Sequence, residues 1–258
     1  MDTNLDGKTA LVTGAGKNIG RAIARGLAAS GARVAVVYSG NADGAAETVA
    51  AITGAGGTAH SFGIDLTDLT SVNAGYDAVV ATLGPVDILV NNAAVRPQRK
   101  LTDVTPELWD TVFAVNVRGP FFLAQKVVPG MMERRWGRII NLGGLHGYKG
   151  SAQRTQVHAS KAAVIGLTRG LAFETAEYGV TANVVVPGRI RVQRGDAAMY
   201  GKQEDHDKAA STVLMKRQGR PEDIADMCVF LASDRASYIS GQEIFVTGGT
   251  FPLIPSET

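Results

Sequence analysis

A glycine-rich segment near the N-terminus has the composition of a phosphate-binding turn. The residues Thr13-Gly14-Ala15-Gly16-Lys17-Asn18-Ile19-Gly20 follow a β-branched apolar run and precede an amphipathic stretch. Small residues let the backbone turn tightly and approach a pyrophosphate, whose charge the N-terminus of the next helix stabilises. We therefore predict a dinucleotide site here, formed by Thr13, Gly14, Gly16, Lys17, Asn18, Ile19 and Gly20.

Groups that can hold or pass a proton gather in a second segment, between residues 144 and 161. It contains His146, Tyr148, His158 and Lys161. Imidazole titrates near neutral pH, and residues three apart on a helix, such as His158 and Lys161, lie on one side of it. His158 and His146 are therefore candidate proton carriers beside Lys161. The alternative is that both histidines and Tyr148 only pack in or around the pocket.

Cationic residues occur in several segments that a parallel sheet would bring to the same edge. They are Arg96, Arg99, Lys100, Arg154, Arg189, Arg191 and Arg194. Such convergence favours an anionic substrate, such as a carboxylate or phosphate, with Arg96 and Arg154 as candidate substrate contacts. The alternative is solvated loop charge.

Short β-branched runs alternate with longer helical patterns along the whole chain. Strands are predicted at residues 9–12, 33–38, 59–63, 88–91, 138–142, 181–186 and 243–246, and helices start near residues 18, 42, 68, 106, 155 and 221. Strands that are apolar on both faces and separated by helices form parallel sheets with right-handed crossovers. The fold class is therefore α/β, with one doubly wound, Rossmann-type parallel sheet of about seven strands flanked by helices.

Composition fits one globular domain over residues 1–258. The apolar fraction is 45%, the charged fraction 19% and the formal net charge +2, which does not indicate a nucleic-acid partner. The single cysteine, Cys228, offers no disulfide and no thiolate cluster for a metal. No signal peptide or membrane-spanning run is expected, so the default location is cytoplasmic. The polar residues at about 189–215 read as a substrate-loop insertion at the edge where ligands bind.

Taken together, these motifs resemble the short-chain dehydrogenase/reductase family, and its FabG-like members, over nearly the whole chain. Asn18 stands where the family commonly has its middle glycine. The resemblance implies that Asn116 and Lys161 belong to the catalytic machinery. It also implies further cofactor contacts, at Asp65, Leu66, Asn92, Ala93, Ala94, Lys161, Pro187, Gly188 and Ile190.

The family's catalytic pattern is broken at two positions. The family carries a Tyr general acid four residues before its Lys and a Ser about thirteen residues before that Tyr. Here those positions hold Val157 and Gly144, which have no proton to give and leave a substrate-facing surface without hydroxyls. Val192 also replaces a usual Thr. Loss of a general acid typically costs about 10²–10⁴ in rate.

The nucleotide preference follows from the end of the second strand. An NAD site usually has an acid there for the adenosine ribose, whereas this strand leads into Ser39 with no acid before Asp43. In the family, a basic residue at the position of Lys17 contacts a 2′-phosphate. We therefore expect NADP(H) to be preferred over NAD(H), unless Lys17 is only a solvated loop charge.

Three functions remain open on these grounds. The first is an NADP(H)-dependent oxidoreductase acting on a small carbonyl, alcohol or imine through a non-standard proton relay. The second is a non-redox lyase, hydrolase or isomerase on the same fold, and the third is a catalytically silent NADP(H)-binding sensor. The resemblance also implies a homodimer or homotetramer.

Overall fold

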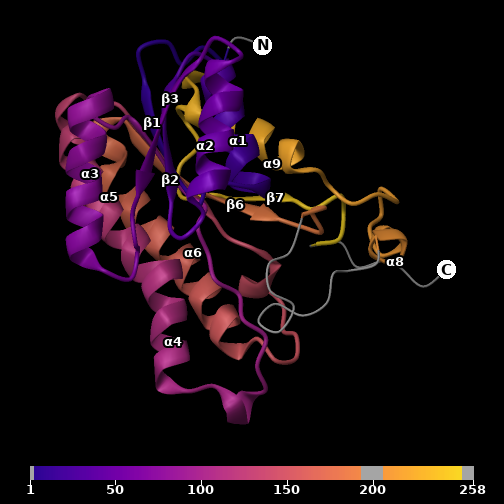
Figure 1. The fold of residues 1–258 in the computed structure, drawn as a ribbon. Coiled ribbons are helices and arrows are strands. Elements are labelled where there is room, and N and C mark those ends of the chain that lie inside the picture. The colour runs from indigo at the N-terminus through magenta and orange to yellow at the C-terminus, as the bar shows by residue number, and fades with distance from the viewer. Residues whose placement is uncertain (1–2, 193–205, 252–258) are drawn as a thin grey trace.

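The computed structural model describes residues 3–192 and 206–251, and these form one parallel sheet covered by helices on both faces (Figure 1). The strands are β1 (Thr9–Thr13), β2 (Arg33–Tyr38), β3 (Thr58–Gly63), β4 (Ile88–Asn91), β5 (Gly137–Leu142), β6 (Val180–Pro187) and β7 (Glu243–Val246). Their order is β3-β2-β1-β4-β5-β6-β7. The predicted fold class is confirmed, and each predicted strand lies within one residue of its observed bounds.

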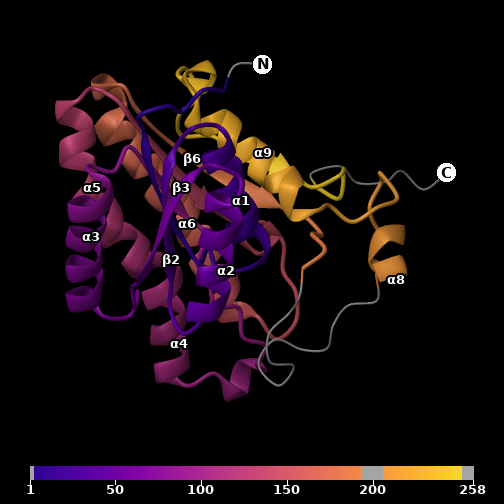
Figure 2. The same cartoon turned by 45° about the horizontal axis from the view of Figure 1, so that its top comes forward.

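Two layers of helix cover the sheet, and alternate strand residues face each of them. On β1, Ala10 and Val12 pack towards α1 (Asn18–Ala29), α2 (Ala42–Thr53) and α9 (Pro221–Ala232). Leu11 faces α3 (Leu69–Leu83), α5 (Gly119–Glu133) and α6 (Thr155–Thr175) on the other side. Figure 2 shows α1, α2 and α9 on one side of the strands and α3 and α5 on the other. Burial on both faces explains why the central strands β1, β4, β5 and β6 are buried along nearly their whole length, whereas the edge strand β3 exposes His60 and Ser61.

The remaining helical elements connect or extend these layers. They are α4 (Pro106–Phe113), a π-helical turn (Ala114–Arg118), α8 (His206–Ser211) and short 3₁₀ turns at Leu101–Asp103, Leu145–Gly147, Ala176–Tyr178 and Asp234–Ala236. Within residues 3–192 and 206–251, no helix combines the length and apolar character needed to cross a bilayer.

The strand order reverses direction between β1 and β4, and this places a ligand-binding crevice at their carboxyl ends. β1 pairs with β2 on one side and with β4 on the other, so the connections leaving β1 and β4 diverge. Open α/β sheets bind ligands at this switch point. The glycine-rich turn follows β1 directly. Part of the predicted insertion at residues 189–215 lies outside the described residues, and Arg194 belongs to that part.

Candidate active site

Thr13, the last residue of β1, fastens the start of the glycine-rich turn to the end of β4. Its buried hydroxyl oxygen accepts hydrogen bonds from the amides of Asn92 and Ala93, both at 3.0 Å. The Asn92 side-chain amide donates to the carbonyl oxygens of Thr13, at 2.9 Å, and Gly14, at 3.2 Å. Four of the predicted cofactor residues therefore form one bonded unit at the switch point.

The glycine-rich turn is wound so tightly that two of its glycines leave no room for a side chain. A Cβ on Gly20 would lie 2.2 Å from the Gly14 carbonyl oxygen and 2.6 Å from Asn92 Nδ2. Gly14 has a φ of +65°, which other residues rarely adopt, and a Cβ there would lie 3.0 Å from Ala93 Cα. This close approach of backbone to backbone is the arrangement that admits a pyrophosphate next to the main chain.

Asn116 and Lys161 lie together at the carboxyl ends of β4 and β5. Asn116, in the π-helical turn, donates from Nδ2 to Ser160 Oγ at 3.0 Å and to the Val95 carbonyl at 3.0 Å. Its Oδ1 accepts the Val95 amide at 2.9 Å. Lys161 Nζ donates to the Leu142 carbonyl oxygen at 2.6 Å. Both side chains line one small cavity, whose size is close to that needed by one water molecule.

Burial controls the charge of Lys161. Desolvation, followed by repulsion from Arg96, lowers the pKa of Lys161 from 10.5 to about 7. An ammonium that loses its hydration is less stable relative to the neutral amine, so the proton becomes easier to remove. Lys161 can therefore give up or take on a proton near neutral pH.

His158 and His146 meet at the 3₁₀ turn after β5, with ring centroids 5.0 Å apart. His158 Nε2 lies 3.0 Å from the Ser151 amide nitrogen, and its Nδ1 lies 2.6 Å from the His146 carbonyl oxygen. Because the amide can only donate, Nε2 accepts and Nδ1 carries the ring proton. Both ring nitrogens of His158 are thus used to hold the loop against α6.

His146 is held neutral. Burial, and then the basic neighbours Arg154, His158, Arg96 and Lys161, lower the pKa of His146 from 6.5 to about 4. A protonated imidazole would be desolvated and repelled by the positive charges of Arg154 and Arg96. At neutral pH the His146 ring is therefore available as an acceptor or a neutral donor.

The loops that carry the predicted substrate residues are bonded to each other. Arg154 Nη1 donates to the Arg96 carbonyl at 2.7 Å, and Gln156 Nε2 donates to the Pro97 carbonyl at 3.1 Å. The Arg99 amide donates to the Gln153 carbonyl at 2.9 Å. The structure therefore brings the Arg96 and Arg154 segments into one wall beside the two histidines.

Gly144 and Val157 occupy different environments. Gly144 has a φ of +156°, and a Cβ built on it would meet no described atom within 4 Å. Val157, on the first turn of α6, has a side chain with 0% exposure. Its carbonyl accepts a hydrogen bond from Ser160 Oγ at 2.9 Å, which links it to Asn116.

The other predicted residues take up structural contacts around the crevice. Asp65 Oδ1 accepts the Thr67 amide and hydroxyl, both at 2.8 Å, and Leu66 is buried. Gly188 lies where a Cβ would be 2.6 Å from Thr247 Cα, and Ile190 bridges to Gly219. The Tyr148 hydroxyl donates to Glu243 at 2.6 Å, and burial, followed by that bond, raises the pKa of Tyr148. Lys17 and Ser39 are exposed, and Ala94 and Pro187 are half-buried.

Sequence reasoning missed several residues that shape this site. Asn91 Nδ2 donates to Asn141 Oδ1 at 2.8 Å across the paired ends of β4 and β5. Arg21 of α1 and Thr48 of α2 donate to carbonyl oxygens of the glycine-rich turn, and Glu47 accepts a hydrogen bond from Arg21. Most of these contacts join residues far apart in the chain, and such contacts leave no local sequence pattern.

Comparison with known proteins defines the class. A family model described as "Enoyl-(Acyl carrier protein) reductase" matches residues 14–250. The chain is 39% identical to the 3-oxoacyl-[acyl-carrier-protein] reductase FabG of Staphylococcus aureus (strain Mu50 / ATCC 700699) over 244 residues, which is 95% of this chain and 98% of that protein. With the fold and the glycine-rich turn described above, these matches show that the chain belongs to the short-chain dehydrogenase/reductase family.

Solved structures agree with this assignment. A gluconate 5-dehydrogenase from Burkholderia cenocepacia J2315 in complex with NADP and tartrate superposes with a TM-score of 0.87 at 32% identity, covering 98% of both chains. A blue fluorescent protein from a metagenomic library in complex with NADPH superposes with a TM-score of 0.88 at 36% identity, covering 96% of this chain and 99% of that one.

Proposed function

We propose that this protein is an NADP(H)-dependent oxidoreductase that acts on a small carbonyl, alcohol or imine through a proton relay without the family's Ser and Tyr. One observation carries the proposal. The buried Lys161, with its neutral-range pKa, lies with Asn116 at the carboxyl end of a sheet whose glycine-rich turn has no room for a side chain at Gly20. The glycine-rich turn that would bind the cofactor and the titratable Lys161 thus lie at the same crevice.

The chain's own residues fit the dinucleotide. The crowding at Gly14 and Gly20 suits a backbone that approaches a pyrophosphate, and Lys17 stands on the exposed side of the same turn. The bound nicotinamide supplies or accepts a hydride. Thr13, Gly14, Gly16, Lys17, Ser39 and Asn92 would hold the adenosine and phosphate end, and Lys161 and Gly188 the nicotinamide side. No acid stands between the end of β2 and Asp43, and relatives were crystallised with NADP or NADPH, which together support NADP(H) over NAD(H).

Lys161 is the group best placed to hold the transferred proton. Reduction of a carbonyl places a proton on oxygen, and in the family pattern a Tyr at position 157 would give it. With Val157 there, Lys161 Nζ is the buried donor in the Asn116 cavity, and its pKa of about 7 lets it cycle between the two forms. An imine substrate that arrives protonated would need this donor least.

The two histidines have supporting parts in this scheme. His158 has both nitrogens occupied, so it positions the His146 turn rather than delivering a proton. His146 is neutral at pH 7 and can accept a hydrogen bond from a substrate hydroxyl or pass a proton during oxidation. His158 and His146 therefore have different proposed tasks, although both were candidate proton carriers from the sequence.

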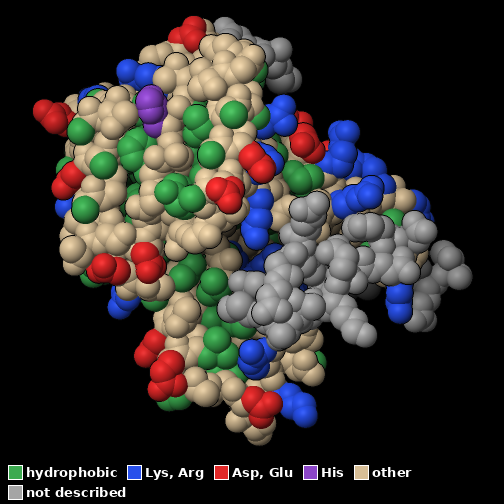
Figure 3. All heavy atoms as spheres, viewed as in Figure 1, with side chains coloured by type: hydrophobic (Ala, Val, Ile, Leu, Met, Phe, Trp, Pro, Cys, Tyr) green, Lys and Arg blue, Asp and Glu red, His purple; other side chains and the backbone are tan. Residues whose placement is uncertain are grey.

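The substrate proposed for this pocket is a small anion. Four basic groups act on one another here, since Arg96, Arg154 and Lys161 all lower the pKa of His146. Figure 3 shows further Lys and Arg side chains on the side that carries α8 and the start of α9, where Lys208, Lys216, Arg217 and Arg220 lie. Such a field attracts carboxylates. The relative from Burkholderia cenocepacia J2315 was solved with tartrate, a dicarboxylate.

The test is a fluorescence titration with NADPH and NADH, followed by a screen of hydroxy acids, keto acids, ketones and imines for a change in nicotinamide absorbance. NADPH binding with turnover, lost in Lys161→Met and kept in the exposed control Lys149→Met, is the expected result. Absence of both binding and turnover in the wild-type protein would overturn the proposal.

A second candidate function, a catalytically silent NADP(H) sensor, is favoured by Val157 and Gly144. The spacing between these positions and Lys161 is the one the family uses, but neither residue has a hydroxyl group. Tight NADPH binding with no turnover on any redox pair would select this function. Release of product without net oxidation or reduction would select the non-redox enzyme instead.

Assembly as a homodimer or homotetramer in the cytoplasm is also proposed. Large apolar side chains stand exposed on the outer helices, with Phe173 of α6 at 90% and Phe121 of α5 at 42%. Apolar groups of this size are typical of surfaces that pack against another subunit. Sedimentation velocity of the wild-type protein and of Phe173→Ser tests this.

A further inference from the structure

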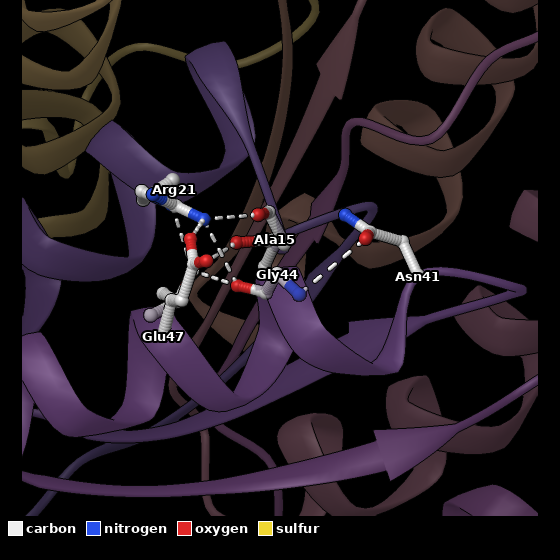
Figure 4. Close-up of polar contacts among 7 residues, drawn as sticks. Ala15, Arg21, Asn41, Gly44 and Glu47 are labelled. Atoms are coloured by element: carbon white, nitrogen blue, oxygen red, sulfur yellow. Dashed lines mark hydrogen bonds and ion pairs between the residues drawn. The ribbon is translucent and has the colours of Figure 1, made fainter.

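The guanidinium of Arg21 lies between the glycine-rich turn and the first turns of α2 (Figure 4). Its Nη2 donates to the Gly16 carbonyl at 2.7 Å and to the Gly44 carbonyl at 3.1 Å. The same nitrogen lies 2.7 Å from Glu47 Oε2, and Nε donates to Thr48 Oγ1 at 3.1 Å. One side chain of α1 thus ties the turn to three residues of α2.

Thr48 completes this set of contacts from the interior. Its side chain is fully buried, and Oγ1 lies 3.0 Å from the Ala15 carbonyl and 2.9 Å from the Gly44 carbonyl. The single hydroxyl proton of Thr48 can be donated to either carbonyl, and donation to Ala15 holds that carbonyl towards α2. The carbonyls of two consecutive turn residues, Ala15 and Gly16, are therefore both held on the α2 side.

Holding these carbonyls fixes the direction of two amides. In a planar trans peptide the C=O and the following N–H point in opposite directions. The Ala15 carbonyl shares its peptide plane with the Gly16 amide, and the Gly16 carbonyl shares its plane with the Lys17 amide. Both amides are thus turned away from α2. Within the described part of the chain, no hydrogen bond takes up either of them.

The space around the turn leaves this arrangement little freedom. A Cβ on Gly16 would lie 3.0 Å from Asn41 Nδ2 and 3.1 Å from the Ala45 amide nitrogen. A Cβ on Gly44 would lie 2.6 Å from the Gly16 carbonyl oxygen. The backbones of the turn and of α2 are therefore in direct contact, so the polar contacts of Arg21 and Thr48 determine which way the peptide planes face.

We infer that Arg21 and Thr48, supported by Glu47, are positioning residues that aim the Gly16 and Lys17 amides at an anionic group of the dinucleotide. The inference rests on the proposed function, because that function requires the dinucleotide. Lys17 is the proposed contact of the 2′-phosphate, so loss of the set weakens binding of NADPH more than binding of NADH. Arg21, Glu47 and Thr48 themselves stay on the far side of the turn from the ligand.

The experiment measures the Kd of NADPH and of NADH by fluorescence titration for the full-length protein. Thr48→Val keeps the shape and removes the hydroxyl, whereas Thr48→Ser restores it. Arg21→Met removes every donor, and Glu47→Gln removes only the charge. Arg25→Met, one turn further along α1 and exposed, is the matched control. Thermal unfolding of each apo protein separates lost affinity from lost folding.

We expect Thr48→Val and Arg21→Met to raise the Kd of NADPH about tenfold. A turn amide that is no longer aimed at the anion loses about one charge-assisted hydrogen bond to it. The NADPH-to-NADH preference should fall, with Thr48→Ser and Arg25→Met close to wild type. Unchanged Kd values in Thr48→Val and Arg21→Met would overturn the inference, as would equal loss in Thr48→Ser. If the wild type binds NADPH without turnover, the redox function fails while these Kd values still decide the inference. If it binds neither nucleotide, both are overturned.

Discussion

His158 donates its Nδ1 proton to the main-chain carbonyl of His146, 2.6 Å away, while its Nε2 accepts the amide of Ser151. His158, which lies three residues before Lys161 and was a candidate proton carrier, therefore has both ring nitrogens occupied by hydrogen bonds. The bond fixes the turn after β5, and with it the His146 ring that faces the basic groups of the crevice.

Replacing His158 tests whether it holds the turn or carries the proton. His158→Leu should lower the free energy of unfolding by about 1–3 kcal/mol, because the Ser151 amide and the His146 carbonyl lose their partner. Its effect on kcat should be smaller than that of Lys161→Met. Urea unfolding and steady-state rates measure the two effects, with the exposed His60→Leu as control. A loss of kcat as large as that of Lys161→Met would return His158 to the catalytic relay.

Lys161 should set the pH dependence of turnover. The protonated amine gives the proton in carbonyl reduction, so kcat should fall as the pH rises through about 7, the pKa to which burial lowers Lys161. Lys161→Arg should remove this titration, because a guanidinium stays charged. Lys161→Met should cost about 10²–10⁴ in kcat. A profile that keeps its inflection near pH 7 in Lys161→Arg would assign the proton to another group.

His146 should make the protein less stable in acid. Its folded pKa of about 4 is below the unfolded value of 6.5, so the unfolded chain binds the proton first. Stability attributable to His146 is full above pH 6.5 and is lost as the pH falls towards about 4. Urea unfolding at a series of pH values should show a shallower loss in His146→Gln than in the wild type. Equal slopes in the two proteins would contradict this, and His60→Gln is the matched control.

Lys17 and Ser39 should control the choice of nucleotide. Lys17→Glu places a negative charge where the 2′-phosphate is proposed to bind, so the Kd of NADPH should rise by about 10–100-fold with a much smaller change for NADH. Ser39→Asp supplies the acid that NAD sites use and should strengthen NADH binding. Fluorescence titrations measure both. Lys126→Glu, exposed on α5, reverses a charge far from the turn, and a preference shift of the same size there would contradict a local role.

The strands could be predicted because their information is local. Arg33–Tyr38, Ile88–Asn91 and Glu243–Val246 have the predicted bounds, since a short β-branched run between turn residues specifies a strand wherever it lies. The predictions for the glycine-rich turn, Lys161, Gly144 and Val157 were likewise made from local information, because each depends only on spacing along the chain. The sequence alone therefore determined the α/β class and the ends of the strands that face the crevice.

Only the tertiary structure decided the contacts, the burial and the pKa of these side chains. Arg21 meets Glu47 and Thr48 because α1 and α2 cross with those faces together, and no periodicity in the sequence encodes that rotation. Burial of Lys161 beneath β5, and the capture of His158 by its own loop, likewise depend on packing between segments far apart or on loop geometry. Residue type and spacing are properties of the chain, whereas burial, pKa and bond partners arise only when distant segments pack against one another.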